Sequence, residues 1–381
     1  MEIYFRNVFK LVYVLFNMKK RVKVAEPNRL TSWMKLVFFL YLFVFAIEII
    51  KKASLMLAPD VKDYLMQGLG PIKAVCVGWF TTAIAQSSGA VSSVTAAFTG
   101  NGLIDLPTAI YIMIGASLGT TITALVISLV VVSVKRRDFR HGVEIGLSYS
   151  IYSALLVFIV VFLEYFFGLF SKVSLFLAEL LQDKISLLKV PDLVGIITGP
   201  LVDALFKLEN NFFLILFGFV ILIFTLRFIS KAIMEVLGGE DRARRFINKY
   251  FDSKYKAYFT GVILTAIVFS SSITIGLLVP LAVSRLISLK KAIPFILGAD
   301  LGTFTDLFLV ALIIDQTNAL AAAIAYALFA VVGAIVFLPN VEFLHKVTKY
   351  VSKSVIGISR RKALYILIAF VLIPLVVVVF F

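Results

Sequence analysis

The stretch GWFTTAIAQSSG, residues 78–89, decides the fold because the chain contains a second copy of it. It aligns without a gap with GVILTAIVFSSS, residues 261–272, at an offset of 183 residues (261 minus 78). A second block, GASLGT at 115–120, aligns with GADLGT at 298–303 at the same offset. Two blocks that share one offset indicate that the chain consists of two related halves.

Apolar residues dominate the chain, at 61% of the sequence, whereas soluble domains contain about half. They come in runs long enough to cross ~30 Å of hydrocarbon. The sequence therefore predicts an all-α polytopic membrane protein, since a β-barrel would show short alternating segments. The single cysteine excludes an internal disulfide, and the two histidines, His141 and His345, lie far apart in the sequence. We expect no Cys/His metal cluster.

Positive charge is concentrated in the short connections between apolar runs, where it sets membrane topology. The net charge of +15 is therefore not taken as a sign of nucleic-acid binding. If the two repeated stretches form re-entrant hairpins, one side of the membrane receives all the strongly basic segments, which are 19–23, 135–140, 242–256, 285–291 and 346–362. This distribution predicts a multi-pass protein of the cell membrane with a cytoplasmic N-terminus.

The expected organisation is two repeats with flanking segments. It comprises an interfacial N-terminal helix (1–32), a first repeat (33–170) with a hairpin at 68–104, an amphipathic extracellular connection (171–209), a second repeat (210–340) with a hairpin at 258–287, and a basic amphipathic segment with a final span (341–381). Hairpin arms of about 15 residues are too short to span separately. Three full spans separate the hairpins, so the repeats are expected to be inverted, as in several transporters. A span hidden in 171–209 would remove the inversion.

Each repeat is also expected to carry a broken transmembrane helix, at 115–121 and at 298–303. A break inside the membrane leaves backbone groups that protein, water or a ligand must satisfy. Amide groups at a helix N-terminus favour an anion, and serine hydroxyls beside it can donate to the same anion. The hairpin tips supply such donors in both halves, namely Ser87, Ser88, Ser270, Ser271 and Ser272.

Freed carbonyls, together with the hydroxyls of Thr120, Thr121 and Thr303, suit a small hard cation. Asp300 and Asp306 lie in the apolar run 294–314, where a carboxylate costs at least ~2.5 kcal/mol at mid-membrane depth. We expect both to face a cation or a water-filled cavity; the alternative is a salt bridge to Arg227. An anion site beside cation sites implies sodium-coupled anion uptake.

The glycines of the two GAxLGT blocks have a second explanation, because small residues spaced by three allow close helix approach. Packing and ion binding are both open for these positions. They are Gly115, Gly119, Gly298 and Gly302.

The QSS motif at 86–88, the SSS motif at 270–272 and the two GAxLGT blocks resemble the type II sodium–phosphate cotransporters. That family repeats a Gln-Ser-Ser-Ser hairpin motif and a Gly-Ala-Asn-Ile-Gly-Thr motif in two inverted halves. The resemblance implies a secondary transporter that couples sodium influx to phosphate uptake by alternating access. It implies that phosphate is bound by Gln86, Ser87, Ser88, Gly89, Ser270, Ser271 and Ser272, and sodium by Ser117, Thr120, Thr121, Asp300, Thr303 and Asp306.

The sequence departs from the family pattern at both motifs. Gly89 stands where the first hairpin motif has its last serine, and Phe269 where the second has its glutamine. Ser117 and Asp300 stand where the family usually has asparagine. These departures bear on the number of sodium ions and on the substrate.

Three other functions compete with this interpretation. A passive anion channel and a sodium- or proton-coupled carrier of another oxyanion both remain open. An enzyme is not expected, because no histidine or lysine base lies in the apolar depth near Ser87 or Ser271. The expected partners are phosphate, sodium and the lipid bilayer, with no cofactor besides the coupling ions; a homodimer is compatible with the sequence.

Overall fold

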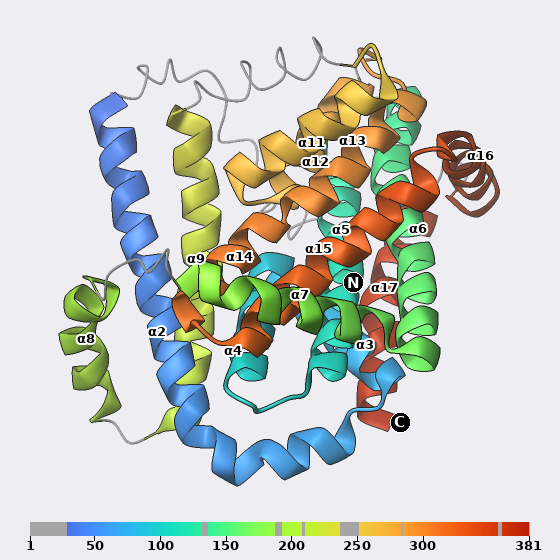
Figure 1. Ribbon diagram of the computed structural model, residues 1–381. Helices are drawn as coiled ribbons and strands as arrows, with labels where there is room; N and C mark the ends of the chain where they lie inside the picture. The colour runs from blue at the N-terminus through green and yellow to red at the C-terminus, as the bar shows by residue number, and fades with distance from the viewer. Residues whose placement is uncertain are drawn as a thin grey trace.

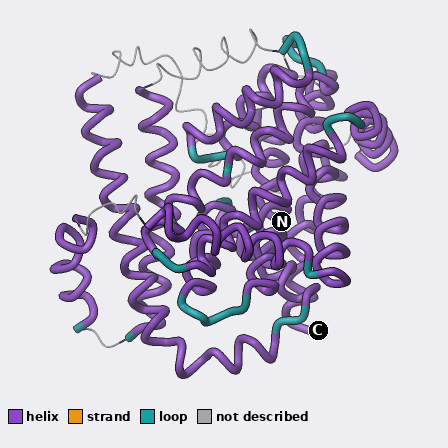
Figure 2. The backbone as a smooth tube through the Cα atoms, in the orientation of Figure 1, coloured by secondary structure: helices purple, strands orange, loops and turns teal. Residues whose placement is uncertain are grey.

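The apolar runs of the sequence form α-helices in the computed structural model, which describes residues 29–131, 136–186, 193–207, 210–236, 251–283, 285–356 and 360–380 (Figure 1). This part of the chain contains helices and no β-strand (Figure 2). The all-α prediction is therefore confirmed for it. Most of the interfacial helix expected at 1–32 lies outside the described residues.

The helices follow one another with short connections. Their bounds are α2 Arg29–Gly68, α3 Pro71–Ala85, α4 Ser88–Gly100, α5 Leu106–Val131, α6 Arg136–Phe167, α7 Leu169–Ser186, α8 Leu193–Phe206, α9 Asn211–Val236, α11 Lys254–Val268, α12 Ser271–Val283, α13 Leu289–Gly302, α14 Phe304–Ile314, α15 Thr317–Phe337, α16 Val341–Val351, a π-helical turn Ser352–Ile356, and α17 Arg360–Phe380.

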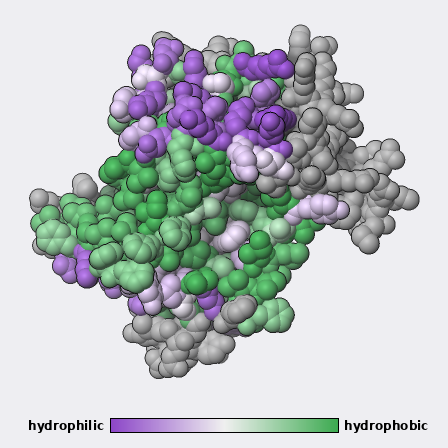
Figure 3. Space-filling model, turned by 90° about the vertical axis from the view of Figure 1, so that its right-hand side faces the viewer, coloured by the Kyte–Doolittle hydropathy of each residue, from purple (hydrophilic) through white to green (hydrophobic). Residues whose placement is uncertain are grey.

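Five stretches of the described residues are long and apolar enough to cross a membrane. They are Thr31–Ala53, Leu106–Val126, Arg140–Phe167, Leu289–Ile314 and Thr317–Phe337. Figure 3 shows a hydrophobic band across the middle of one face, with hydrophilic side chains gathered above it and a smaller group below. A multi-pass membrane protein accounts for both observations. The spans expected at 212–234 and 363–381 are helical, as α9 and α17.

Each of the two repeated stretches folds into a pair of short antiparallel helices. The first pair is α3 and α4, and the second is α11 and α12. In Figures 1 and 2 the chain enters and leaves the first pair at the bottom of the view, and it enters and leaves the second pair at the top. The open ends of the two helical hairpins therefore lie at opposite ends of the view.

The break expected at 115–121 is wrong, because α5 runs without interruption through the whole GASLGT block. Its glycines serve packing: a Cβ on Gly115 would lie 2.0 Å from the carbonyl oxygen of Val75, and one on Gly119 would lie 2.5 Å from that of Trp79. The block's Thr120 hydroxyl donates to a carbonyl of its own helix, the Ala116 oxygen, at 3.2 Å. The helix therefore stays intact and α3 lies directly against it.

The corresponding block of the second half does interrupt its helix, and this prediction is confirmed. α13 ends at Gly302 and α14 begins at Phe304, with Thr303 between them. The Thr303 N–H bonds to the Asp300 carbonyl three residues back, at 3.3 Å. The close packing nevertheless recurs, since a Cβ on Gly298 would lie 2.0 Å from the Tyr258 oxygen, and one on Gly302 would lie 2.6 Å from the Val262 oxygen.

The outer helices surround these elements. α2 packs along α9, and α7 packs against α15. The corner between α6 and α7 is built by Glu164, whose carboxylate accepts from the backbone N–H groups of Phe170 at 2.8 Å and Ser171 at 3.1 Å. Among the described residues, neither α7 nor α8 is one of the five candidate spans.

Candidate functional site

The two hairpin tips have the same backbone geometry at positions 183 residues apart. Gln86 and Phe269 both end their helices in the left-handed conformation, with φ of 53° and 57°. Their N–H groups bond to the carbonyls of Thr82 at 2.7 Å and Thr265 at 2.8 Å. Phe269 stands where the family pattern has glutamine, so the tip conformation does not depend on that side chain.

A serine begins the second helix of each hairpin. The Ser87 Oγ accepts from the N–H of Ala90, and the Ser270 Oγ accepts from the N–H of Ile273, both at 3.3 Å. Serine is a favoured N-cap because its oxygen satisfies one of the free amides of the first turn. Each hydroxyl hydrogen remains available to an anion. Both caps thus have a structural role as well as the predicted ligand role.

The other predicted phosphate ligands lie at the same helix starts with different exposure. Ser88 and Ser271 are buried, at 4% and 3% exposure. Gly89 is also buried, whereas Gln86 is exposed and Ser272 is partly buried. Ser88 and Ser271, one from each tip, are therefore the hydroxyls best shielded from lipid and water.

Both hairpins pack against helix α5. α3 and α4 pack against it from one hairpin, and α12 packs against it from the other. Tyr149 of α6 is fully buried, and its hydroxyl lies near those of Ser271 and Ser117. A tyrosine of α6 therefore lies between the second hairpin tip and α5.

Asp300 is fully buried and has two hydroxyl donors. The Ser117 Oγ donates to Asp300 Oδ1 at 3.1 Å, and the Tyr152 Oη donates to Oδ2 at 2.9 Å. Ser117 and Asp300 occupy the same position in the two GAxLGT blocks, so equivalent residues of the two halves touch. A buried charge is tolerated only where it is hydrogen-bonded or paired.

The predicted threonine ligands also lie in the interior. The Thr303 hydroxyl donates to the Ala299 carbonyl at 3.1 Å, which repeats the bond that Thr120 makes in the first half. The Thr121 hydroxyl donates to the Leu118 carbonyl at 2.9 Å and accepts from Ser150 at 2.9 Å. The hydroxyl oxygens of Thr120 and Thr303 keep lone pairs that a cation can use.

Asp306 lies in the first turn of α14 with 1% exposure. Its Oδ1 accepts from the Leu307 N–H at 2.8 Å, and its Oδ2 has no hydrogen-bond partner among the described residues. The side chain of Arg227, the alternative partner, lies outside those residues. A buried carboxylate oxygen without a partner is a strong candidate for binding a cation or a proton.

Two groups of buried polar residues were not predicted from the sequence. The first is the set of buried tyrosines, which includes Tyr149, Tyr152 and Tyr326; the last interacts with Thr303. The second is Ser92 and Ser93 of α4, which are fully buried and whose hydroxyls have no partner among the described residues. Polar side chains in the middle of apolar helices were the available signal for both groups.

The fold and the site together define a polytopic α-helical membrane protein with polar groups buried around two helical hairpins. The chain belongs to the Na+/Pi-cotransporter family, whose family model matches residues 42–182 and 221–359. It is a family of transporters and not of enzymes. Each matched stretch contains one hairpin and one GAxLGT block, in agreement with the duplication.

Several relatives are similar to this chain at 22–33% identity. The rat sodium-dependent phosphate transport protein 2A is 22% identical over 88% of this chain and 65% of its own length. Human sodium-dependent phosphate transport protein 2B is 23% identical over 45% of this chain and 25% of its own length. The uncharacterised protein YqeW of Bacillus subtilis is 33% identical over 27% of this chain. No solved structure matches the chain.

Proposed function

We propose that the protein imports inorganic phosphate across the cell membrane by coupling it to sodium influx through alternating access. Membership of the Na+/Pi-cotransporter family supports this function. The names of the rat, mouse and human relatives, all sodium-dependent phosphate transport proteins, point the same way. The chain spans about two thirds, 65%, of the length of the rat relative.

The repeated geometry of the two hairpin tips is the observation that carries the proposal. Each tip presents a helix N-terminus capped by a serine, followed by a buried serine, Ser88 in one half and Ser271 in the other. Free amides at a helix N-terminus and hydroxyl hydrogens are the donors that an oxyanion needs. Phosphate therefore binds at the tips, with Gln86, Gly89 and Ser272 at the edges of the site.

The sodium ions bind among the buried oxygens of α5, α13 and α14. Asp306 offers an unpartnered carboxylate oxygen, and Asp300 a carboxylate held by two hydroxyls. The hydroxyls of Thr120, Thr121 and Thr303 add neutral oxygen ligands of the kind hard cations prefer. A bound sodium ion lowers the free-energy cost of burying the carboxylate's negative charge. It therefore stabilises the conformation in which the carboxylate is buried, and this couples ion binding to the change in conformation.

The two halves form inverted repeats with re-entrant hairpins, and the N-terminus lies in the cytoplasm. The opposite entry of the hairpins in Figure 1 supports the inversion. So does the contact between Ser117 and Asp300, because equivalent residues meet where a twofold axis passes. The repeats keep the sequence-based boundaries, 33–170 and 210–340.

Radiolabelled phosphate uptake into proteoliposomes tests the function. An inward sodium gradient should drive uptake that a matched potassium gradient does not, and arsenate should compete because it copies the shape and charge of phosphate. Uptake that ignores sodium and does not saturate would indicate a channel. Folded protein without any sodium-driven phosphate uptake would refute the proposal and direct attention to other oxyanions and to proton coupling.

Variants of the hairpin serines test the site. Ser88→Ala and Ser271→Ala should each abolish uptake while the protein still purifies as a folded species. Ser148→Ala is the matched control, because that buried hydroxyl donates within its own helix, to Ile145, at 2.8 Å. Normal phosphate uptake in both hairpin variants would refute the assignment of the phosphate site to the hairpin tips.

A further inference from the structure

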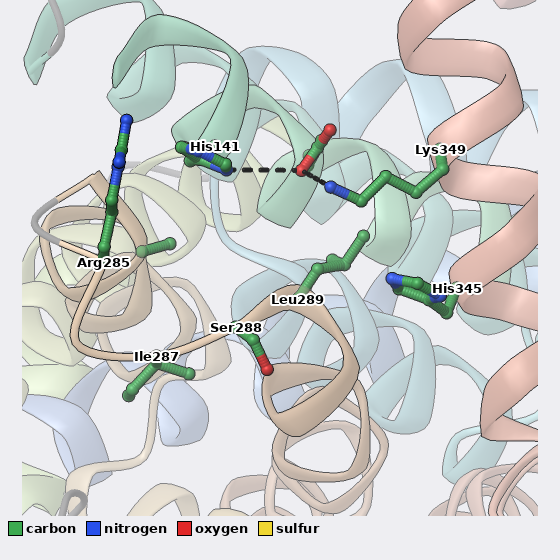
Figure 4. Close-up of a pocket in the computed structure, with 9 residues that line it drawn as sticks. His141, Arg285, Ile287, Ser288, Leu289, His345 and Lys349 are labelled. Atoms are coloured by element: carbon green, nitrogen blue, oxygen red, sulfur yellow. Dashed lines mark hydrogen bonds and ion pairs between the residues drawn. The ribbon is translucent and has the colours of Figure 1, made fainter. Parts of the chain in front are cut away.

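A polar cavity lies at the end of the molecule where the second hairpin opens. Its volume is about 570 Å³, and it is formed by α6, α16, the end of α12 and the turn into α13 (Figure 4). Both histidines of the chain line it, although 204 positions (345 minus 141) separate them. The polar lining residues are His141, Glu144, Arg285, Ser288, His345 and Lys349.

The charge of this cavity is positive even though it contains a carboxylate. Glu144, with 1% of its side chain exposed, accepts from Arg140 Nε and from Lys349 Nζ, both at 2.9 Å. Figure 4 shows His141 and Lys349 directed toward this carboxylate from opposite sides. Arg140 and Lys349 carry two positive charges against the single negative charge of Glu144. The guanidinium group of Arg285 adds a third positive charge.

A neighbouring acid does not cancel this surplus. Glu342 of α16 forms an ion pair with Lys290, and this ammonium group holds the pKa of Glu342 below its ordinary value. The pair crosses from α16 to the first turn of α13. It therefore fixes α16 beside the cavity without placing an unpaired carboxylate in it.

The turn that carries Arg285 has a backbone conformation that usually belongs to glycine. Arg285 has φ of +59°, and the chain closes α12 with a bond from the Leu286 N–H to the Leu281 carbonyl at 2.9 Å. Such a helix end favours glycine, and another residue there costs roughly 1 kcal/mol. Arg285 therefore lines the cavity from a backbone position that is unfavourable for an arginine.

The start of α13 adds neutral donors. Ser288 precedes the helix, and its side chain does not cap it. The N–H groups of Lys291 and Ala292 bond to the Ser288 carbonyl at 3.0 and 3.1 Å. Those of Leu289 and Lys290, at the positive dipole end, have no partner among the described residues. The Nδ1 atoms of His141 and His345 face Glu144 and Glu342, each at 3.7 Å, so a neutral ring would donate to an oxyanion through Nε2–H. Cations, a hydroxyl and free amides thus line one cavity.

We propose that this cavity is a second anion site, separate from the hairpin tips, that binds the phosphate group of a phosphate ester. Pockets of about 300–1,000 Å³ hold whole organic ligands, so the volume favours an ester over a bare phosphate ion. The ester comes either from an anionic lipid headgroup or from a soluble compound. Apart from its cytoplasmic location, which follows the topology proposed above, the site does not rest on the proposed transport function.

Two probes separate these sources in a Ser88→Ala/Ser271→Ala background, which removes the hairpin hydroxyls. The first is glycerol 3-phosphate, titrated by calorimetry against protein in phosphatidylcholine nanodiscs. The second is phosphatidylglycerol, whose retention over phosphatidylcholine is measured by native mass spectrometry. Binding of either probe supports the site and identifies its source.

Charge-removing variants decide whether binding occurs in this cavity. Arg285→Gln/His345→Gln should weaken binding at least about tenfold, the equivalent of one lost charged hydrogen bond. Lys346→Gln is the matched control, because it removes a charge from the exposed face of α16 outside the cavity. If the double variant folds poorly, Arg285→Lys is measured instead. It keeps the positive charge and should therefore retain binding.

Three results would overturn the proposal. The first is that neither probe binds. The second is that Lys346→Gln weakens binding as much as the double variant does, which would show general surface attraction. The third is that the double variant binds the probe as tightly as the background protein does. None of these results bears on the sodium-driven uptake assay, so the two proposals fail independently.

Discussion

Replacing Gly115 by alanine is the sharpest test of how α3 and α5 pack. The new Cβ would lie 2.0 Å from the Val75 carbonyl oxygen, whereas ordinary contacts begin at 3.4 Å. The helices must therefore separate by about 1.4 Å, the difference between these two distances. Overpacking of this kind costs typically 1–3 kcal/mol. With an unfolding entropy of about 2.1 cal/mol/K per residue, each kcal/mol lowers Tm by roughly 1 °C in a chain of 381 residues.

The assay is the melting temperature of the purified protein in detergent, followed by loss of the monodisperse peak in size-exclusion chromatography. Gly298→Ala should lower Tm by a similar amount, because its Cβ would lie 2.0 Å from the Tyr258 oxygen in the other half. Gly70→Ala is the control, since nothing lies within 4 Å of its Cβ. Equal melting temperatures for Gly115→Ala and Gly70→Ala would refute the argument.

The remaining predictions concern buried carboxylates. Asp300→Asn keeps the hydrogen-bonding shape but removes the charge, so sodium titration of uptake should show an affinity at least about tenfold weaker; an unchanged titration would exclude Asp300 as a sodium ligand. Tyr152→Phe deprives the same carboxylate of a donor, a loss of about 1–3 kcal/mol, and Tm should fall accordingly. Glu164→Ala removes the acceptor of the Phe170 and Ser171 amides at the start of α7, so hydrogen exchange at these two amides should accelerate while α6 keeps its protection.

The hairpins could be predicted because their signal is local and doubled. Polar tips between apolar arms, repeated at one offset, determine two short helices and a turn in each half. The left-handed conformation of Phe269 was not evident, because phenylalanine carries no preference for it. It follows from the equivalent tip at Gln86, which adopts the same turn.

The uninterrupted course of α5 was not predictable from its composition. GASLGT and GADLGT differ at one position, serine in the first and aspartate in the second, yet only the second block is followed by a helix break. The sequences diverge just after the block, where Asp306 occupies the first turn of α14. Contacts between distant segments, such as those of Tyr152 with Asp300, arise only when α6 and α13 are packed together.

The contact between Ser117 and Asp300 limits how the two halves can evolve. A residue on a symmetry axis meets its own copy, so identical halves would place two aspartates about 3 Å apart, and both could not ionise. One carboxylate can be kept there only if the other copy supplies a neutral donor. Duplicated halves with a charge at their meeting point must therefore differ in sequence at that point, and here the difference is a serine facing an aspartate.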